Sequence, residues 1–217
     1  MTFLKLTAAV PLVLAAGLAH ATTYEFIGPP GFGEDLNTTE VFMDTTNSFS
    51  VEVTAINTEQ PPVPLLHWDD HGLGVNSEGG LLQDGLENIG DDEAIVFDFG
   101  TVVDLEEISL TRAGSPDEYR IYGTNDGSVE NCTMGGLTCL TSVSTLIASG
   151  NGTGLIGGAD VDLTGNSYQY LIATTPTGSG DRYRIDSVSV APVPLPAAGL
   201  LMVAGLGGLA ALRRRKK

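Results

Sequence analysis

The most chemically suggestive part of the chain is residues 67–71, HWDDH. On a helix the two imidazoles, four residues apart, would share one face and could bind zinc. The proline-rich residues 61–64 before this segment and Gly72 after it argue against a helix. We therefore expect a polar loop with Trp68 folded onto the domain. The Trp68 ring is also a candidate platform for a sugar ring.

Two acidic pairs are candidate calcium ligands, because calcium prefers carboxylate and carbonyl oxygens. They are Asp69 with Asp70, and Asp91 with Asp92. Neither pair has the spacing of an EF-hand loop, so solvated surface charge is the alternative. No cofactor is expected otherwise.

The final predicted strand brings an aromatic ring and a cation, Tyr183 and Arg184. With Trp68 they form the candidate ligand-binding set, since they could contact a sugar or an anion. Pairing of the arginine with the acidic surface is the alternative. The chain has no G-x-S-x-G elbow and no setting for a cysteine nucleophile, so we predict that it is not an enzyme. Plentiful carboxylates leave a glycoside hydrolase as a less favoured alternative.

The charge distribution excludes one class of partner. Six of the ten Lys and Arg lie in the terminal segments, so residues 22–190 carry four arginines against all 27 acidic residues, a formal charge of −23. Such a surface repels phosphate backbones, which argues against nucleic-acid binding. It favours solubility and divalent cations.

Residues 1–21 have the layout of a signal peptide. Lys5 precedes an apolar run over residues 6–18, and Ala19 and Ala21 form an A-x-A cleavage site. The mature chain is therefore predicted to begin at Thr22, outside the cytoplasm. An uncleaved anchor is the alternative, which the short apolar run disfavours. In an oxidising compartment the only two cysteines, Cys132 and Cys139, are expected to form a disulfide that closes a loop rather than holds the core.

Residues 191–217 consist of a proline-containing motif, an apolar stretch and a basic end. The motif is Val193, Pro194, Leu195, Pro196 and Ala197. Residues 197–212 carry no charge and are predicted to form a transmembrane helix, roughly 24 Å long at about 1.5 Å per residue. The basic end is predicted to stop transfer and stay cytoplasmic; it is Arg213, Arg214, Arg215, Lys216 and Lys217.

In their order and position these three parts resemble the PEP-CTERM sorting signal of Gram-negative bacteria, in its VPLPA variant. The resemblance implies that a membrane exosortase recognises the motif, cleaves near it and passes the protein to the cell surface or extracellular matrix. Such proteins commonly occur in bacteria that make exopolysaccharide, which the resemblance makes the natural partner. An ordinary tail anchor is the alternative.

Residues 22–190 are predicted to form one all-β domain. Runs rich in β-branched and aromatic residues are separated by Gly-containing turns. We predict no helix, and strands over 22–27, 48–56, 93–99, 102–110, 118–123, 142–148, 159–163, 168–174 and 182–190. Short strands of this kind indicate a single antiparallel β-sandwich of the jelly-roll type.

Residues 93–100, 118–127 and 182–190 resemble strands of discoidin and other galactose-binding-like jelly rolls. The resemblance implies a binding module rather than a catalyst. The combined prediction is an exported, exosortase-sorted surface or matrix protein that binds or structures exopolysaccharide without catalysis. A calcium-stabilised structural protein without glycan affinity is the alternative.

Overall fold

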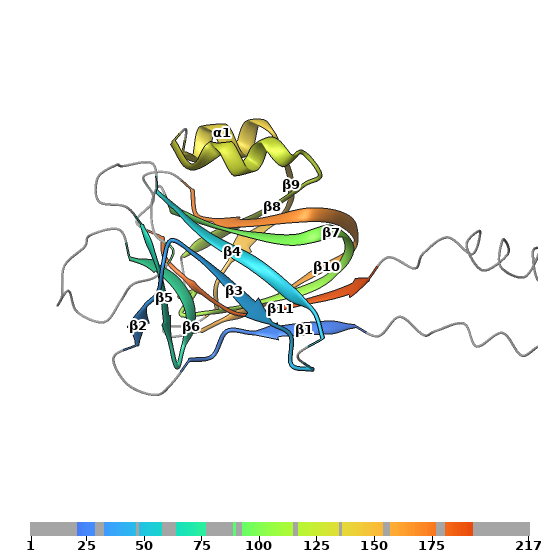
Figure 1. Ribbon diagram of the computed structural model, residues 1–217. Helices are drawn as coiled ribbons and strands as arrows, with labels where there is room; N and C mark the ends of the chain where they lie inside the picture. Colours follow the sequence, from blue (N-terminus) through green and yellow to red (C-terminus); the bar gives the residue numbers. More distant parts are fainter. Residues whose placement is uncertain are drawn as a thin grey trace, which may run out of the picture.

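The computed structural model describes residues 21–28, 33–46, 48–57, 64–76, 89, 93–114, 117–134, 136–153, 157–176 and 181–192. Over these ranges the chain forms an antiparallel, sandwich-like β structure with two short helical segments (Figure 1), which confirms the predicted all-β class. The strands are β1 (Thr22–Glu25), β2 (Glu34–Asp35), β3 (Thr39–Met43), β4 (Ser50–Asn57), β5 (Leu65–Asp69), β6 (Gly72–Asn76), β7 (Glu93–Thr111), β8 (Glu118–Thr124), β9 (Thr145–Asn151), β10 (Ala159–Thr174) and β11 (Arg184–Pro192). The helical segments are the 3-10 helix η1 (Gly127–Met134) and α1 (Gly136–Ser142).

Two long strands, β7 and β10, connect the two layers. The first half of β7 pairs with β4 and its second half with β11. β10 pairs with β7 on both sides of its bend, and its second half also pairs with β8. Gly100 of β7 and Gly165 of β10 have φ values of 68° and 85°, a left-handed conformation that glycine adopts without strain. Figure 1 shows both strands curving around the core.

The order of neighbouring strands is β2-β5-β6-β11-β7-β10-β8-β9. β1 joins β11, and β3 joins the sheet through β4, which pairs with β7. The core lies between the two layers because alternate strand residues point inward. Val51 and Val53 of β4 and Ile95 and Phe97 of β7 are all fully buried there.

A second apolar cluster lies on the other face of β4, β7 and β10, beneath the two helices (Figure 1). It consists of the strand residues Ile56, Ala94, Val96, Tyr170 and Ile172 and the helix residues Val129, Cys132, Leu137 and Leu140. The predicted disulfide joins Cys132 to Cys139, with a Cα–Cα distance of 5.4 Å, and so links η1 to α1. The expectation that it only closes a loop is wrong, because Cys132 is fully buried in this cluster.

Several local predictions also need correction. Residues 93–111 and 159–174 each form one bent strand where two were predicted, because the strand continues through a glycine bend. Residues 136–142 form a helix that is too short to show a helical apolar period, so β9 begins later than predicted. The polar loop expected at residues 67–71 belongs instead to the β5–β6 hairpin, with Asp70 and His71 at its turn.

The predicted signal peptide, apart from Ala21, lies outside the described residues, as do Val193 to Ala197, the apolar stretch and the basic end. Within the described ranges, no helix has the length and apolar character needed to cross a membrane.

Candidate functional site

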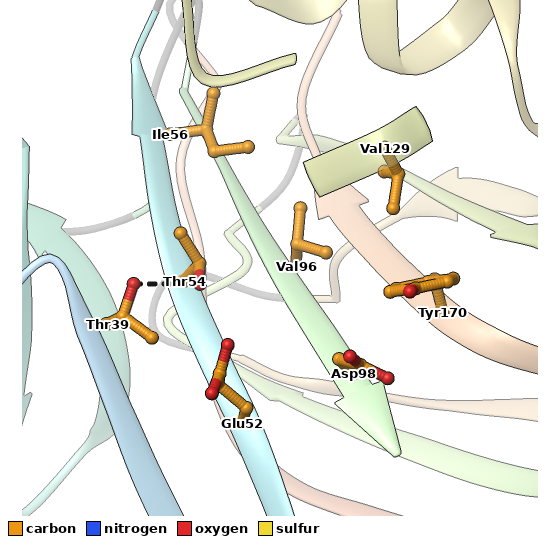
Figure 2. Close-up of a pocket in the computed structure, with 8 residues that line it drawn as sticks. All are labelled: Thr39, Glu52, Thr54, Ile56, Val96, Asp98, Val129 and Tyr170. Carbon is orange, nitrogen blue, oxygen red and sulfur yellow. Dashed lines mark hydrogen bonds between the residues drawn. The ribbon is translucent and has the colours of Figure 1, made fainter. Parts of the chain in front are cut away.

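A pocket of about 200 Å³ opens on the outer face of the layer that contains β4 and the first half of β7, beside η1 (Figure 2). Its lining comes from five elements: Thr39 of β3, Glu52, Thr54 and Ile56 of β4, Val96 and Asp98 of β7, Val129 of η1, and Tyr170 of β10. This volume lies below the roughly 300–1,000 Å³ of typical ligand pockets. The pocket therefore suits a small ring or the end of a chain.

The strand period explains why these side chains meet. Glu52 and Thr54 alternate along β4 with the buried core residues Val51 and Val53, so they point away from the core. The same alternation directs Val96 and Asp98 of β7 outward. In the antiparallel register Glu52 lies opposite Asp98 and Thr54 lies opposite Val96. The pairing therefore places two carboxylates side by side at one end of the pocket.

The pocket has an apolar floor and a polar rim. Ile56, Val96, Val129 and the Tyr170 ring are buried, whereas Glu52 and Thr39 are exposed. The hydroxyls of Thr39 and Thr54 lie 3.0 Å apart and share a hydrogen bond (Figure 2). An apolar floor with a few polar groups at the rim is the usual composition of a small-ligand site.

The two rim carboxylates differ in their contacts. Asp98 Oδ1 accepts hydrogen bonds from the Gly100 amide at 2.7 Å and from Gln169 Nε2 at 3.1 Å. The Glu52 side chain forms no hydrogen bond or ion pair with any other residue that the structure describes. Like charges directly opposite each other on paired strands are destabilising. This arrangement favours a ligand that donates hydrogen bonds or carries positive charge.

None of the eight pocket residues was a candidate at the level of the sequence. The alternation in β4 and β7 could have placed Glu52 and Asp98 on outward faces. Their meeting depends on the β4–β7 pairing, which joins segments about forty residues apart. The η1 wall depends on a helix that the sequence pattern does not indicate.

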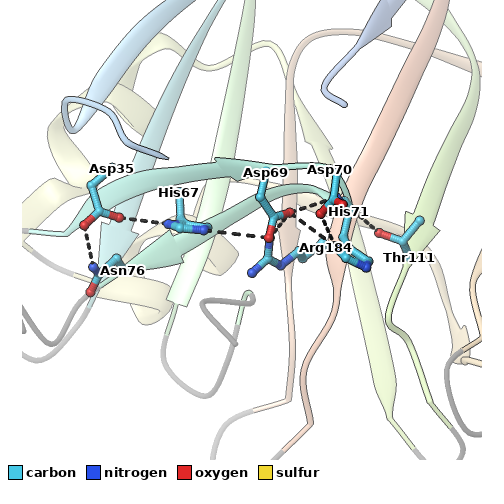
Figure 3. Close-up of polar contacts among 8 residues, drawn as sticks. All are labelled: Asp35, His67, Asp69, Asp70, His71, Asn76, Thr111 and Arg184. Atoms are coloured by element: carbon cyan, nitrogen blue, oxygen red, sulfur yellow. Dashed lines mark hydrogen bonds and ion pairs between the residues drawn. The ribbon is translucent and has the colours of Figure 1, made fainter. Parts of the chain in front are cut away.

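The residues that drew attention in the sequence form a polar network around the β5–β6 hairpin (Figure 3). At its centre the guanidinium of Arg184 contacts Asp69 Oδ1. The two side chains are 0% and 6% exposed. A buried charge requires a compensating partner, so this ion pair anchors the hairpin to β11.

The network extends to both sides of Asp69. His67 Nδ1 lies 2.9 Å from Asp35 Oδ1, and His67 Nε2 lies 3.9 Å from Asp69 Oδ2. The His71 amide donates to Asp69 Oδ1 at 2.8 Å, and His71 Nδ1 lies 2.6 Å from Asp70 Oδ1. Ion pairs and hydrogen bonds therefore account for both histidines, and the hairpin excludes the helical face that a zinc pair would need.

Of the two candidate calcium-binding pairs, only Asp69 and Asp70 lie among the described residues. Ligand atoms of Asp69, Asp70 and His71 lie within 4.8 Å of one another. However, Asp69 already contacts the Arg184 cation and is buried. Asp91 and Asp92 lie outside the described residues. We assign no metal to this turn.

The candidate ligand-binding set also needs correction. Tyr183 is fully buried and its hydroxyl donates to the Thr174 carbonyl at 2.8 Å. Burial, with a smaller contribution from Tyr119, raises the pKa of Tyr183 well above its ordinary value. Arg184 is fully buried as well, so neither side chain is available to a ligand at the surface. The sequence places both on the last predicted strand as ligand contacts, but their side chains lie in the interior where β11 begins.

Trp68 is partly buried and packs against the core. Its ring meets Phe42 in an edge-to-face contact with centroids 6.4 Å apart. The indole nitrogen is buried and has no hydrogen-bond partner among the described residues. Trp68 therefore packs β5 against β3. This agrees with the expectation that its ring folds onto the domain.

No protein-family model matches the sequence, and no curated protein matches it. Solved structures similar to the chain include CpGH89CBM32-5 from Clostridium perfringens in complex with GalNAc-β-1,3-galactose, at 10% identity and a TM-score of 0.35, covering 66% of this chain and 95% of that one. Chitosan-binding module 1 from a Paenibacillus sp. IK-5 chitosanase/glucanase is 17% identical at a TM-score of 0.34, covering 65% and 93%. The family 32 CBM from C. perfringens NanJ, in complex with galactose, is 16% identical at 0.33, covering 65% and 93%. Likenesses with TM-scores this low carry no argument about ligand or activity.

Proposed function

We propose that this chain is an exported, non-catalytic glycan-binding module of the cell surface or extracellular matrix, built on a galactose-binding-like jelly roll. The observation that carries the proposal is the pocket between β3, β4, β7, β10 and η1. In this pocket an apolar floor, two carboxylates and two threonine hydroxyls converge.

The pocket composition suits a sugar ring. A pyranose has apolar C–H faces and a rim of hydroxyl groups. The buried side chains of Val96 and Tyr170 offer a surface for the C–H face. The carboxylates of Glu52 and Asp98 can accept hydrogen bonds from hydroxyls, and such charge-assisted bonds are stronger than neutral ones. A shallow, small site of this kind should bind in the roughly micromolar to millimolar range.

The pocket does not favour hydrolysis. A glycosidase needs one carboxyl that apolar surroundings keep protonated beside a second that stays ionised. Glu52 is exposed to water, and Asp98 Oδ1 accepts hydrogen bonds from two N–H groups, so neither carboxyl has the enclosed apolar surroundings that a glycosidase acid requires. Release of reducing sugar from a bound glycan would contradict the non-catalytic proposal.

The export proposal rests on the sequence of the two ends. Ala19 and Ala21 mark the cleavage site, and the VPLPA motif at 193–197 marks the site for an exosortase. The disulfide between Cys132 and Cys139 supports an oxidising compartment. The protein would first be held in the membrane by residues 197–212 and then be passed to the surface or matrix. The intact mass of the protein recovered from cells tests both processing steps, because it changes with each cleavage.

Glycan binding is tested by affinity electrophoresis in exopolysaccharide from the producing cells. Thr39→Phe places a ring at the mouth of the pocket and should weaken binding at least about tenfold. Thr101→Phe introduces the same ring at an exposed position on the β7 bend, away from the pocket, and serves as the matched control. Equal mobility of the wild type with and without the glycan, in folded protein, would overturn the proposal.

A further inference from the structure

We propose that the pocket prefers a sugar with a free, protonated amine over the same sugar in neutral or N-acetylated form. This inference rests on the proposed function and names its ligand class. It follows from the charge of the rim together with the shape of the cavity.

The rim of the pocket carries two carboxylates. Glu52 and Asp98 lie opposite each other in the β4–β7 register, and both line the pocket (Figure 2). Neither takes part in an ion pair among the residues that the structure describes, whereas Asp69 and Glu118 are each paired with an arginine. A cationic ligand group between the two carboxylates would relieve their repulsion and gain two charge-assisted hydrogen bonds.

The number of oxygen atoms at the rim favours an ammonium group over a metal ion as the ligand. Calcium takes six to eight oxygen ligands, about two of which the rim can supply as carboxylates. Asp98 Oδ1 is already engaged by Gly100 and Gln169, and the floor beneath the carboxylates is apolar. An ammonium group needs only two or three acceptors at hydrogen-bond distance. The donor set therefore fits an amine better than a metal.

The apolar floor and the threonine hydroxyls favour a sugar amine over a lysine side chain. The floor made by Ile56, Val96 and Val129 is broad enough to involve three elements, which suits the face of a ring. The hydroxyls of Thr39 and Thr54 lie on the β3 side of the pocket, where ring hydroxyls could reach them. A lysine would leave both hydroxyls without a ligand partner.

The test compares two probes by isothermal titration calorimetry at about pH 6, below the pKa of a primary amine. The probes are the β-1,4-linked glucosamine tetramer and its fully N-acetylated counterpart. The amine-bearing tetramer should bind at least about tenfold more tightly, as expected for one added charge-assisted hydrogen bond. Glu52→Gln should remove most of this preference. It should weaken the binding of the acetylated tetramer much less, because the amide oxygen still accepts hydrogen bonds from hydroxyls.

The matched control is Glu107→Gln, which removes one exposed carboxylate from the second half of β7, where that strand pairs with β11. It removes the same single negative charge as Glu52→Gln. If Glu107→Gln weakens amine binding as much as Glu52→Gln, the attraction is general and the inference is wrong. Equal affinity for both tetramers would also overturn it while leaving the proposed function standing. Binding of tetralysine as tight as that of the glucosamine tetramer would overturn ring recognition. Failure of every glycan, neutral or cationic, to bind would remove both the inference and the proposed function.

Discussion

Replacement of Asp69 by Asn should destabilise the protein strongly. The substitution keeps the size of the side chain and removes the negative charge that the buried guanidinium of Arg184 contacts. The pair joins the β5–β6 hairpin to β11, so the loss falls on the attachment of the hairpin to the sheet.

The magnitude follows from the burial of the pair. With side chains that are 6% and 0% exposed, removal of one partner should cost about 3–5 kcal/mol of unfolding free energy. Typical domains have only about 5–15 kcal/mol in total. For a domain of this size each kcal/mol lowers the Tm by about 2–4 °C, so the Tm should fall by roughly 6–20 °C.

The assay is thermal and urea unfolding followed by circular dichroism. Asp70→Asn, at the neighbouring exposed position of the same turn, is the matched control and should change the stability by less than about 1 kcal/mol. The double variant Asp69→Asn with Arg184→Met should regain part of the loss, because it also removes the buried cation. A loss below about 1 kcal/mol for Asp69→Asn would refute the structural role assigned to this pair.

Three further substitutions test the packing and electrostatics of the fold. Trp68→Ala should cost about 2–4 kcal/mol, measured by urea unfolding, because the ring packs against the core; an unchanged midpoint would return Trp68 to the candidate ligand set. Changing Cys132 and Cys139 to Ser should cost about 2–3 kcal/mol from the closed loop and more from the buried Cys132 position, so a Tm unchanged from the wild type would contradict its place in the second cluster. Burial, followed by two neighbouring carboxylates, raises the pKa of Asp186, so its ionised form costs stability above that pKa. Asp186→Asn should therefore raise the Tm at neutral pH, and the gain should shrink as the pH falls through the raised pKa toward the ordinary value of an aspartate, about 3.9; a gain that does not vary with pH would exclude this electrostatic origin.

The strands that the sequence predicts well are those with strict alternation. In β4, Val51, Val53 and Ala55 face the core, and in β7, Ile95 and Phe97 do so, as a period of two requires. The β5–β6 hairpin was missed because His67 and Asp69 are polar yet buried. The burial of Asp69 depends on Arg184, a partner more than a hundred residues away, which local patterning cannot reveal.

The site could not be predicted for a similar reason. Each pocket residue looks ordinary in its own strand, and Glu52 and Asp98 are two among 27 acidic residues. Their significance arises from the register between β4 and β7 and from the η1 wall. Conversely, Tyr183 and Arg184 have the residue types of a ligand site, but their burial assigns them to the interior.

The most direct test of glycan binding in this pocket is amide chemical-shift mapping by NMR during titration with fragments of the exopolysaccharide. We expect the largest shifts at Glu52, Thr54, Asp98 and Gly100, around the pocket between β4 and β7. Shifts confined to the β5–β6 turn at Asp70 and His71, or the absence of shifts at saturating glycan, would contradict this expectation.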